Sequence, residues 1–243
     1  MTKVKRLVTA LGVGIAICGG AWAAARVPQV SASIPAAKSL QGGAAAAVPA
    51  NKVLLYSQLD SPGAQATNTQ NFEAANDAFD NELADDFVVP AGGWSIDTVF
   101  VDGLYFNGPG PAPTVHVAFY ANSGALPGAA VAGCDYPAVV PADAAGNFTL
   151  ALAPACALAP GTYWVSVVAN MNFTPAGQYG WGDRTVTSNS PAAWRNPGGG
   201  FGTPCAAFAA RGAVCGIDAP APDQLFSLSG TVSPVELLDV GVE

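Results

Sequence analysis

Thr114-Val115-His116-Val117-Ala118-Phe119-Tyr120 is the segment that decides the fold, because apolar side chains recur at every second position. Val115, Val117 and Phe119 share this period of two, which places them on one face of an extended strand. The intervening side chains then point to the opposite face. The segment therefore predicts a half-buried strand, in a sheet that covers a hydrophobic core on one side.

Short β-branched and aromatic runs of the same kind continue from Val53 to the end of the domain, separated by turn-forming clusters such as 107–111. We expect strands at 86–89, 96–106, 114–121, 131–136, 148–152, 162–169 and 225–228. Only one segment has helical spacing, residues 71–83. The connections are too short for helical crossovers, so the strands are expected to pair antiparallel. The chain is therefore expected to form an all-β, jelly-roll-like antiparallel sandwich with a long Gly-rich loop region.

The first 25 residues have the organisation of a secretory signal peptide. Lys3, Lys5 and Arg6 precede an uncharged apolar run at 7–17, and small residues that suit a cleavage site follow. The run is too short to span a bilayer. We therefore expect a signal peptide at 1–25, a flexible Ala/Pro/Ser-rich linker at 26–51, one β-sandwich domain at 52–232 and a C-terminal tail at 233–243. The predicted location is secreted or periplasmic.

The charge balance is acidic. The chain carries 17 acidic and 9 basic residues, a formal net charge of −8, and cleavage would remove three of the basic ones. Nucleic acids and anionic membranes bind cationic surfaces, so neither is an expected partner. No further apolar run approaches the length of a membrane span. Because no lysine or arginine occurs between Lys52 and Arg184, a carboxylate buried there must be satisfied by backbone N–H groups, hydroxyls or a metal ion.

Four cysteines follow the predicted signal peptide: Cys134, Cys156, Cys205 and Cys215. An even number in an exported chain predicts two disulfides. Three pairings are open, and the nearest-neighbour one, Cys134 with Cys156 and Cys205 with Cys215, is the simplest. A zinc site is disfavoured because no Cys-x-x-Cys motif occurs and His116 is the only histidine.

Several phrases of the sequence resemble a known group of proteins: ADDFVVP at 84–90, WSI at 94–96, GTYWVSV at 161–167 and NSPAAW at 189–194. The chain resembles an uncharacterised family of exported bacterial β-sandwich modules, some of which carry surface-sorting tails. The resemblance covers about residues 53 to 230. It implies the fold and export, and it carries over no catalytic residues. Residues 233–243 lack the hydrophobic helix and basic cluster of a sorting tail, so membrane sorting is not expected.

Carboxylates and asparagines are dense between residues 71 and 86, without a basic residue among them. Calcium takes six to eight oxygen ligands, so this segment predicts a Ca²⁺ site formed by Asp77, Asp80, Asp85 and Asp86. Asp85 and Asp86 are the stronger candidates because they start a strand. The spacing does not match an EF-hand. The alternative interpretation is a solvated acidic segment that keeps the protein soluble.

The Gly-rich connection from 177 to 216 contains several large aromatic residues, Phe201 among them, together with arginines. Long ordered loops of this kind are often functional. Aromatic rings stack on sugar faces while polar groups bond the hydroxyls, so we expect a ligand-binding platform there. Its predicted residues are Tyr179, Trp181, Arg184, Trp194 and Arg195. The alternative is that these aromatics cap the end of the sandwich and that Arg184 pairs with a neighbouring acid.

No complete catalytic constellation is present in the sequence. A Gly-x-Ser-x-Gly elbow is absent, and the lone His116 reads as an ordinary strand residue. We therefore favour an exported non-enzymatic module that binds polysaccharide or another cell-surface glycan, with calcium as a structural ion. A carbohydrate-active hydrolase or lyase that uses Asp and Glu is the first alternative. A purely structural extracellular component is the second.

Overall fold

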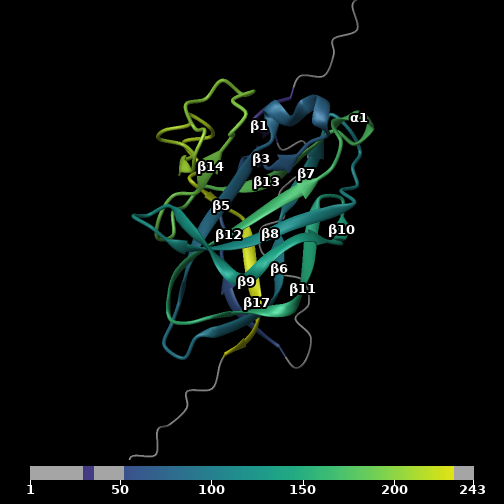
Figure 1. Ribbon diagram of the computed structural model, residues 1–243. Coiled ribbons are helices and arrows are strands. Elements are labelled where there is room, and N and C mark those ends of the chain that lie inside the picture. Colours follow the sequence, from purple (N-terminus) through teal and green to yellow (C-terminus); the bar gives the residue numbers. More distant parts are fainter. Residues whose placement is uncertain (1–29, 36–51, 233–243) are drawn as a thin grey trace, which may run out of the picture.

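The computed structural model describes residues 30–35 and 52–232 (Figure 1). The predicted signal peptide, most of the predicted linker and the C-terminal tail lie outside these ranges. The described chain is almost entirely strand, with a short 3₁₀ helix η1 (Ala74–Phe79) and one helical turn α1 (Phe173–Ala176). The strands are β1 (Ser33–Pro35), β2 (Val53–Ser57), β3 (Pro62–Asn68), β4 (Gln70–Asn71), β5 (Glu82–Val89), β6 (Trp94–Val101), β7 (Gly103–Phe106), β8 (Thr114–Asn122), β9 (Pro127–Val139), β10 (Ala142–Ala144), β11 (Asn147–Leu158), β12 (Gly161–Asn170), β13 (Gln178–Arg184), β14 (Ala193–Arg195), β15 (Ala209–Ala210), β16 (Asp223–Gln224) and β17 (Phe226–Val232).

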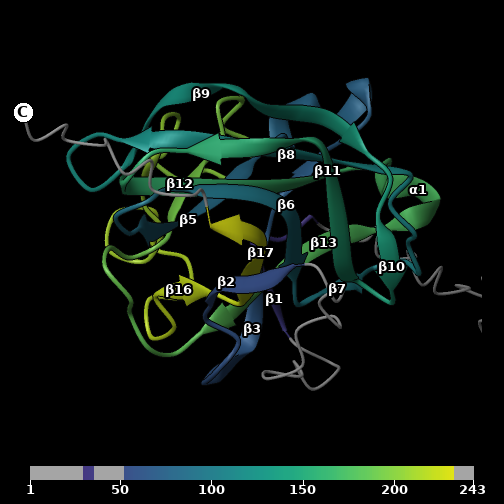
Figure 2. The same ribbon diagram turned by 90° about the horizontal axis from the view of Figure 1, so that it is seen from below.

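The strands form three sheets, and the predicted all-β class is confirmed. The first sheet has the order β1-β3-β13-β16, with β7 also paired to β13. The second has the order β10-β11-β6-β17-β2, and the third β15-β14-β5-β12-β8-β9, with β4 on β12. All pairs are antiparallel except β4 with β12, a two-residue parallel contact. Figure 2 shows β8, β12 and β5 as one layer lying over β6, β17 and β2.

The main core lies between the second and third sheets, and the period of two in β8 determines which of its side chains enter it. Val115, Val117 and Phe119 are completely buried, whereas His116 and Tyr120 on the same strand are partly exposed. Opposite them, Val99 and Phe148 of the second sheet belong to the same buried cluster. The prediction of a half-buried strand at 114–120 is therefore confirmed.

The helix expected at 71–83 is largely wrong. Only the six residues of η1 are helical, and β5 begins at Glu82. Phe72 and Leu83 are both buried, which produced the apparent helical spacing. Leu83 is nevertheless a strand residue, in a part of β5 where all residues from 83 to 87 are buried. Pairing of β5 with β12 and β14 overrides the local pattern.

The predicted linker contains a strand. Ser33–Pro35 forms β1 and pairs with β3, with Ile34 opposite Ala66. Ile34 is completely buried and packs in a small cluster with Leu59, Leu104 and Leu225. A single isoleucine among small residues has no period, so the sequence alone gave no sign that this segment pairs with the domain.

The Gly-rich stretch at 177–216 contains three strands, β13, β14 and β15, so it is not one continuous long loop as predicted. All seven residues of β13 are buried, with β3 on one side and β7 and β16 on the other. Gly180 is needed there because a Cβ on it would lie 2.9 Å from both the Ala66 Cβ and the Ile34 Cδ1. The irregular part is confined to the segments that flank β14 and β15.

Two disulfides are present, in the nearest-neighbour pairing. Cys134–Cys156 joins β9 of the third sheet to β11 of the second, and Cys205–Cys215 closes a loop between β14 and β16. Both bonds are compatible with an extracellular location. Within residues 30–35 and 52–232, no helix has the length and apolar character required to cross a bilayer.

Candidate functional site

The three aromatic residues predicted to form an exposed platform are buried. Tyr179, Trp181 and Trp194 have no exposed surface. The Trp181 Nε1 donates a hydrogen bond to the Leu225 carbonyl oxygen at 2.8 Å, and the Trp194 Nε1 donates to the Asn68 carbonyl oxygen at 3.1 Å. Both indole N–H groups are therefore satisfied inside the core, whereas the buried Tyr179 hydroxyl has no hydrogen-bond partner among the described residues. All three rings are core side chains, and we correct the platform prediction for them.

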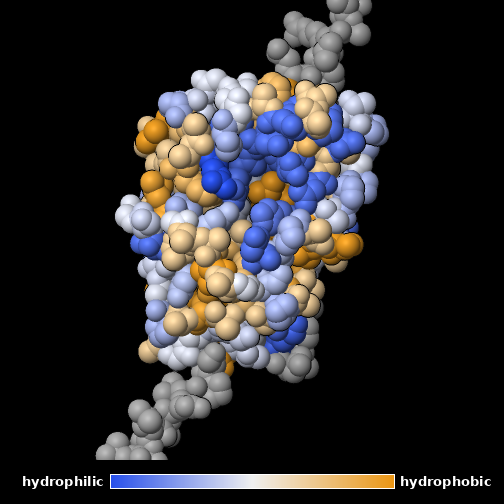
Figure 3. Space-filling model, viewed as in Figure 1, coloured by the Kyte–Doolittle hydropathy of each residue, from blue (hydrophilic) through white to orange (hydrophobic). Residues whose placement is uncertain are grey.

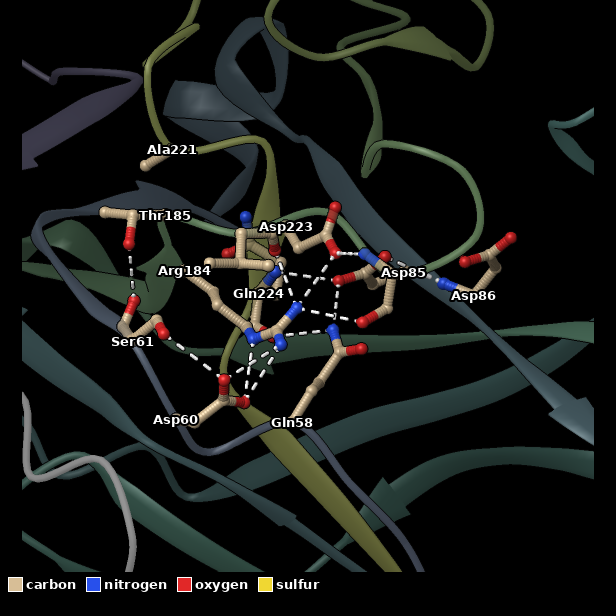
Figure 4. A network of polar contacts seen from close by, with 12 residues as sticks. Gln58, Asp60, Ser61, Asp85, Asp86, Arg184, Thr185, Ala221, Asp223 and Gln224 are labelled. Atoms are coloured by element: carbon tan, nitrogen blue, oxygen red, sulfur yellow. Dashed lines mark hydrogen bonds and ion pairs between the residues drawn. The ribbon is translucent and has the colours of Figure 1, made fainter.

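Arg184 is also buried, and its guanidinium is occupied by acidic partners (Figure 4). Its Nε and Nη2 donate to the two carboxylate oxygens of Asp60 at 3.0 and 3.1 Å. Its Nη1 lies 3.4 Å from the Asp223 Oδ2 and donates to the Val186 carbonyl oxygen at 2.6 Å. The alternative expectation, that Arg184 pairs with a neighbouring acid, is confirmed.

Asp85 and Asp86 point to opposite faces of β5, as neighbouring residues in a strand do. The Asp85 Oδ2 accepts hydrogen bonds from the Gln58 side chain at 2.6 Å and from the Gln224 backbone N–H at 2.7 Å. Asp86 accepts from the backbone N–H of Ser190. Burial, and secondly the nearby Asp223, raises the pKa of Asp85 well above its ordinary value. Asp85 thus accepts a backbone N–H, as the sequence predicted, together with a side-chain amide that was not among the predicted donors.

The four aspartates of the predicted calcium site are not brought together as one ligand set. Asp77 is exposed on η1, and the Asp80 Oδ1 accepts the Phe72 backbone N–H at 2.7 Å. Across the described ranges, no group of three or more His, Cys, Asp or Glu side chains is placed to hold a metal ion. Calcium binding by Asp77, Asp80, Asp85 and Asp86 stays a prediction from the sequence.

A polar groove of about 260 Å³ lies on the outer face of the third sheet, beside η1. Figure 3 shows hydrophilic residues gathered on the upper half of this face. The side chains reach it because they occupy the outward positions of their strands: His116 alternates with Val115 and Val117, and Asn170 follows the buried Ala169. The polar side chains that line the groove are Gln70, Asn71, Asp80, Asn81, Glu82, His116, Asn170 and Arg195.

Arg195 is the only predicted platform residue that lines this groove, and its charge is balanced there. Its Nε donates to the Glu82 Oε2 at 2.9 Å and its Nη2 to the same oxygen at 2.5 Å. The Tyr120 hydroxyl donates to the Glu82 Oε1 at 2.6 Å, and the Arg195 guanidinium lies 4.4 Å from the centre of the Phe208 ring. These contacts hold the guanidinium in one place while its side chain remains about one-third exposed.

His116 is held by an acid at the other side of the groove. Its Nε2 lies 2.5 Å from the Asp135 Oδ1 on β9. Since this nitrogen is occupied, only the Nδ1 is left for a molecule in the groove. Our sequence interpretation treated His116 as an ordinary strand residue, counted Glu82 and Asn71 only within the acidic segment at 71–86 and gave no role to Asn170. A usable signal was present: polar residues at the outward positions of a predicted strand.

Comparison of the chain with protein-family models, with curated proteins and with solved structures finds no match in any of the three. The groove itself therefore carries the functional argument. It offers amide, carboxylate, imidazole and guanidinium groups in one shallow depression, with the strongest opposite charges already paired. Such a lining forms many directional hydrogen bonds with a neutral polar molecule.

Proposed function

We propose that this protein is an exported, non-enzymatic β-sandwich module that binds a neutral glycan in the polar groove on the outer face of the third sheet. The single observation that carries the proposal is the convergence of Glu82, His116, Asn170 and Arg195 in one depression. Sugar hydroxyls both donate and accept hydrogen bonds, and this lining supplies partners for both roles.

The charge of the groove favours a neutral ligand. The Glu82 carboxylate is bonded to Arg195 and Tyr120, so its negative charge is compensated within the protein. The remaining carboxylate in the lining, Asp80, would repel an anionic sugar. The acidic balance of the whole chain acts in the same direction.

Export is part of the proposal, and its support is the signal-peptide pattern of residues 1–25 together with two disulfides. A glycan on the cell surface or in the extracellular medium would then be within reach. The competing hydrolase or lyase is distinguished by turnover, because binding and cleavage have separate assays.

A glycan array with the mature protein, followed by calorimetric titration of the best ligand, tests the proposal. Asn170→Ala should weaken binding about tenfold, since it removes an amide whose hydrogen bond is worth about 1.4 kcal/mol. Glu82→Gln should weaken binding by a similar factor, because it replaces an acceptor oxygen by a donor and disturbs the bonds that hold Arg195 and Tyr120 in place. Thr187→Ala is the matched control on an exposed loop away from the groove and should bind like the wild type. Wild-type affinity of both groove variants would refute the site. Release of reducing sugar would show that the protein is an enzyme and not a non-enzymatic binding module.

A further inference from the structure

A second hollow adjoins the polar groove. It has a volume of about 390 Å³ and shares two lining residues with the groove, Asn71 and Asn170. The rest of its lining is mostly apolar and comes from the residue after β4, the segment before β8, the segment after β12 and α1: Phe72, Pro111, Pro113, Met171, Asn172, Pro175 and Ala176. A polar and an apolar depression therefore meet at one pair of asparagines.

Side-chain amides form the boundary between the two hollows. The Asn71 Nδ2 donates to the Asn170 Oδ1 at 3.1 Å. The Asn170 Nδ2 in turn donates to the Thr114 Oγ1 at 3.1 Å and to the Pro137 carbonyl oxygen at 3.0 Å, which fixes the Asn170 amide. The boundary contact is thus a bond between two side chains, and Asn71 is exposed. A ligand that lies across the boundary can therefore contact the Asn71 side chain without any movement of the backbone.

The sizes of the hollows indicate a ligand longer than one sugar. Sites for small molecules span about 300 to 1,000 Å³, and the polar groove at about 260 Å³ lies below that range. With the apolar hollow added, the joined depression lies well within it. A ligand that occupies both hollows must carry hydroxyls at the end that lies in the polar groove. At its other end it must carry an apolar group, next to a polar group that can bond the asparagine side chains.

We infer that the joined grooves bind a neutral oligosaccharide of N-acylated amino sugars, with an acyl group seated in the apolar hollow. This inference rests on the proposed function. An acetamido group suits the boundary because its N–H and carbonyl oxygen can bond the Asn71 and Asn172 amides, which both donate and accept. Its methyl group then packs against Pro113 and Met171, where burial of an apolar group is favourable.

The test compares two neutral tetrasaccharides of the same linkage, a β-1,4-linked N-acetylglucosamine tetramer and a β-1,4-linked glucose tetramer, by calorimetric titration. The N-acetylated tetramer should bind about tenfold more tightly, and the N-acetylglucosamine monomer should bind more weakly than its tetramer. Asn172→Trp fills the apolar hollow and should abolish this preference while the glucose tetramer still binds. Thr187→Trp, on an exposed loop elsewhere, is the matched control and should keep the preference.

Pro113→Asp, which places a charge at the rim of the same hollow, is a second variant in case Asn172→Trp folds poorly, and melting temperatures establish folding for both. Equal binding of the two tetramers, unaffected by Asn172→Trp, would overturn the acyl-group inference and leave the glycan site intact. No binding of either tetramer, together with a silent glycan array, would overturn both proposals.

Discussion

The Arg211 Nη1 lies 3.2 Å from the Asp183 Oδ2, and neither side chain has any exposed surface. Arg211 also donates to the Thr67 Oγ1 at 2.8 Å and to the Ala221 carbonyl oxygen. It thus joins β3, β13 and the segment before β16. A buried ion pair adds little net stability by itself, but removing one partner leaves an uncompensated charge in the core.

Arg211→Ala should therefore lower the free energy of unfolding by about 3–5 kcal/mol. Arg195→Ala is the matched control, because Arg195 is paired with Glu82 at the surface, and it should cost no more than about 1 kcal/mol. Urea denaturation of both variants at about pH 8, above the pKa of about 7 that Asp183 has in the folded protein, measures the difference. Equal and small losses would show that the buried pair is not required for the fold.

Stability should fall as the pH rises from about 4 to about 8. Burial is the main cause that raises the pKa of Asp183 and of Asp223 from 3.8 to about 7. Between 3.8 and about 7 the folded state holds protons that the unfolded state has released, so the stabilisation present at pH 4 is lost as pH passes through 7.

Chemical denaturation at several pH values measures this slope. Asp223→Asn should flatten the slope, because the asparagine carries no titrating proton and its oxygen can still accept from the Ser188 N–H. Stability that increases over the same interval would contradict the assignment of these two carboxyls.

All tryptophans in the described residues should resist quenching by acrylamide and emit at short wavelength, because Trp94, Trp164, Trp181 and Trp194 are at most 5% exposed. Trp181→Ala should cost about 3–5 kcal/mol of stability, as truncation of a large core side chain does. Trp164→Ala should cost a similar amount, although Trp164 packs in a separate cluster on the outer face of the third sheet. Strong quenching of the wild-type protein would show that these rings are exposed after all.

Mass spectrometry of the mature protein should show a mass about 4 Da below that of the fully reduced form, with four thiols appearing on reduction. Loss of Cys134–Cys156 by Cys134→Ser with Cys156→Ser should cost about 3 kcal/mol, since the bond closes a loop over a sequence separation of 22. Free thiols in the unreduced protein would refute the pairing.

Much of the fold could be predicted from local pattern. The alternation in 114–120 determines which face of β8 is buried, because a strand has a period of two whatever its neighbours are. The number and context of the cysteines likewise predicted two disulfides, and the nearest-neighbour pairing is the observed one. The absence of basic residues between Lys52 and Arg184 predicted that a buried carboxylate there would be satisfied by backbone N–H groups, hydroxyls or a metal ion. Asp85 does accept a backbone N–H, from Gln224, but its second donor is the Gln58 side-chain amide, which was not predicted.

Only the tertiary structure decided which polar and aromatic side chains reach the surface. Trp181 and Trp194 lie in sequence surroundings typical of a loop, but strands brought from distant parts of the chain cover them. Gly180 accompanies close packing of β13 against Ile34 and Ala66 rather than a flexible connection. The groove follows the same rule: Glu82, His116 and Arg195 come from three strands that are far apart in sequence, so no local pattern joins them. A residue's own strand determines which face it points to, whereas the strands packed around it determine whether that face is core or solvent.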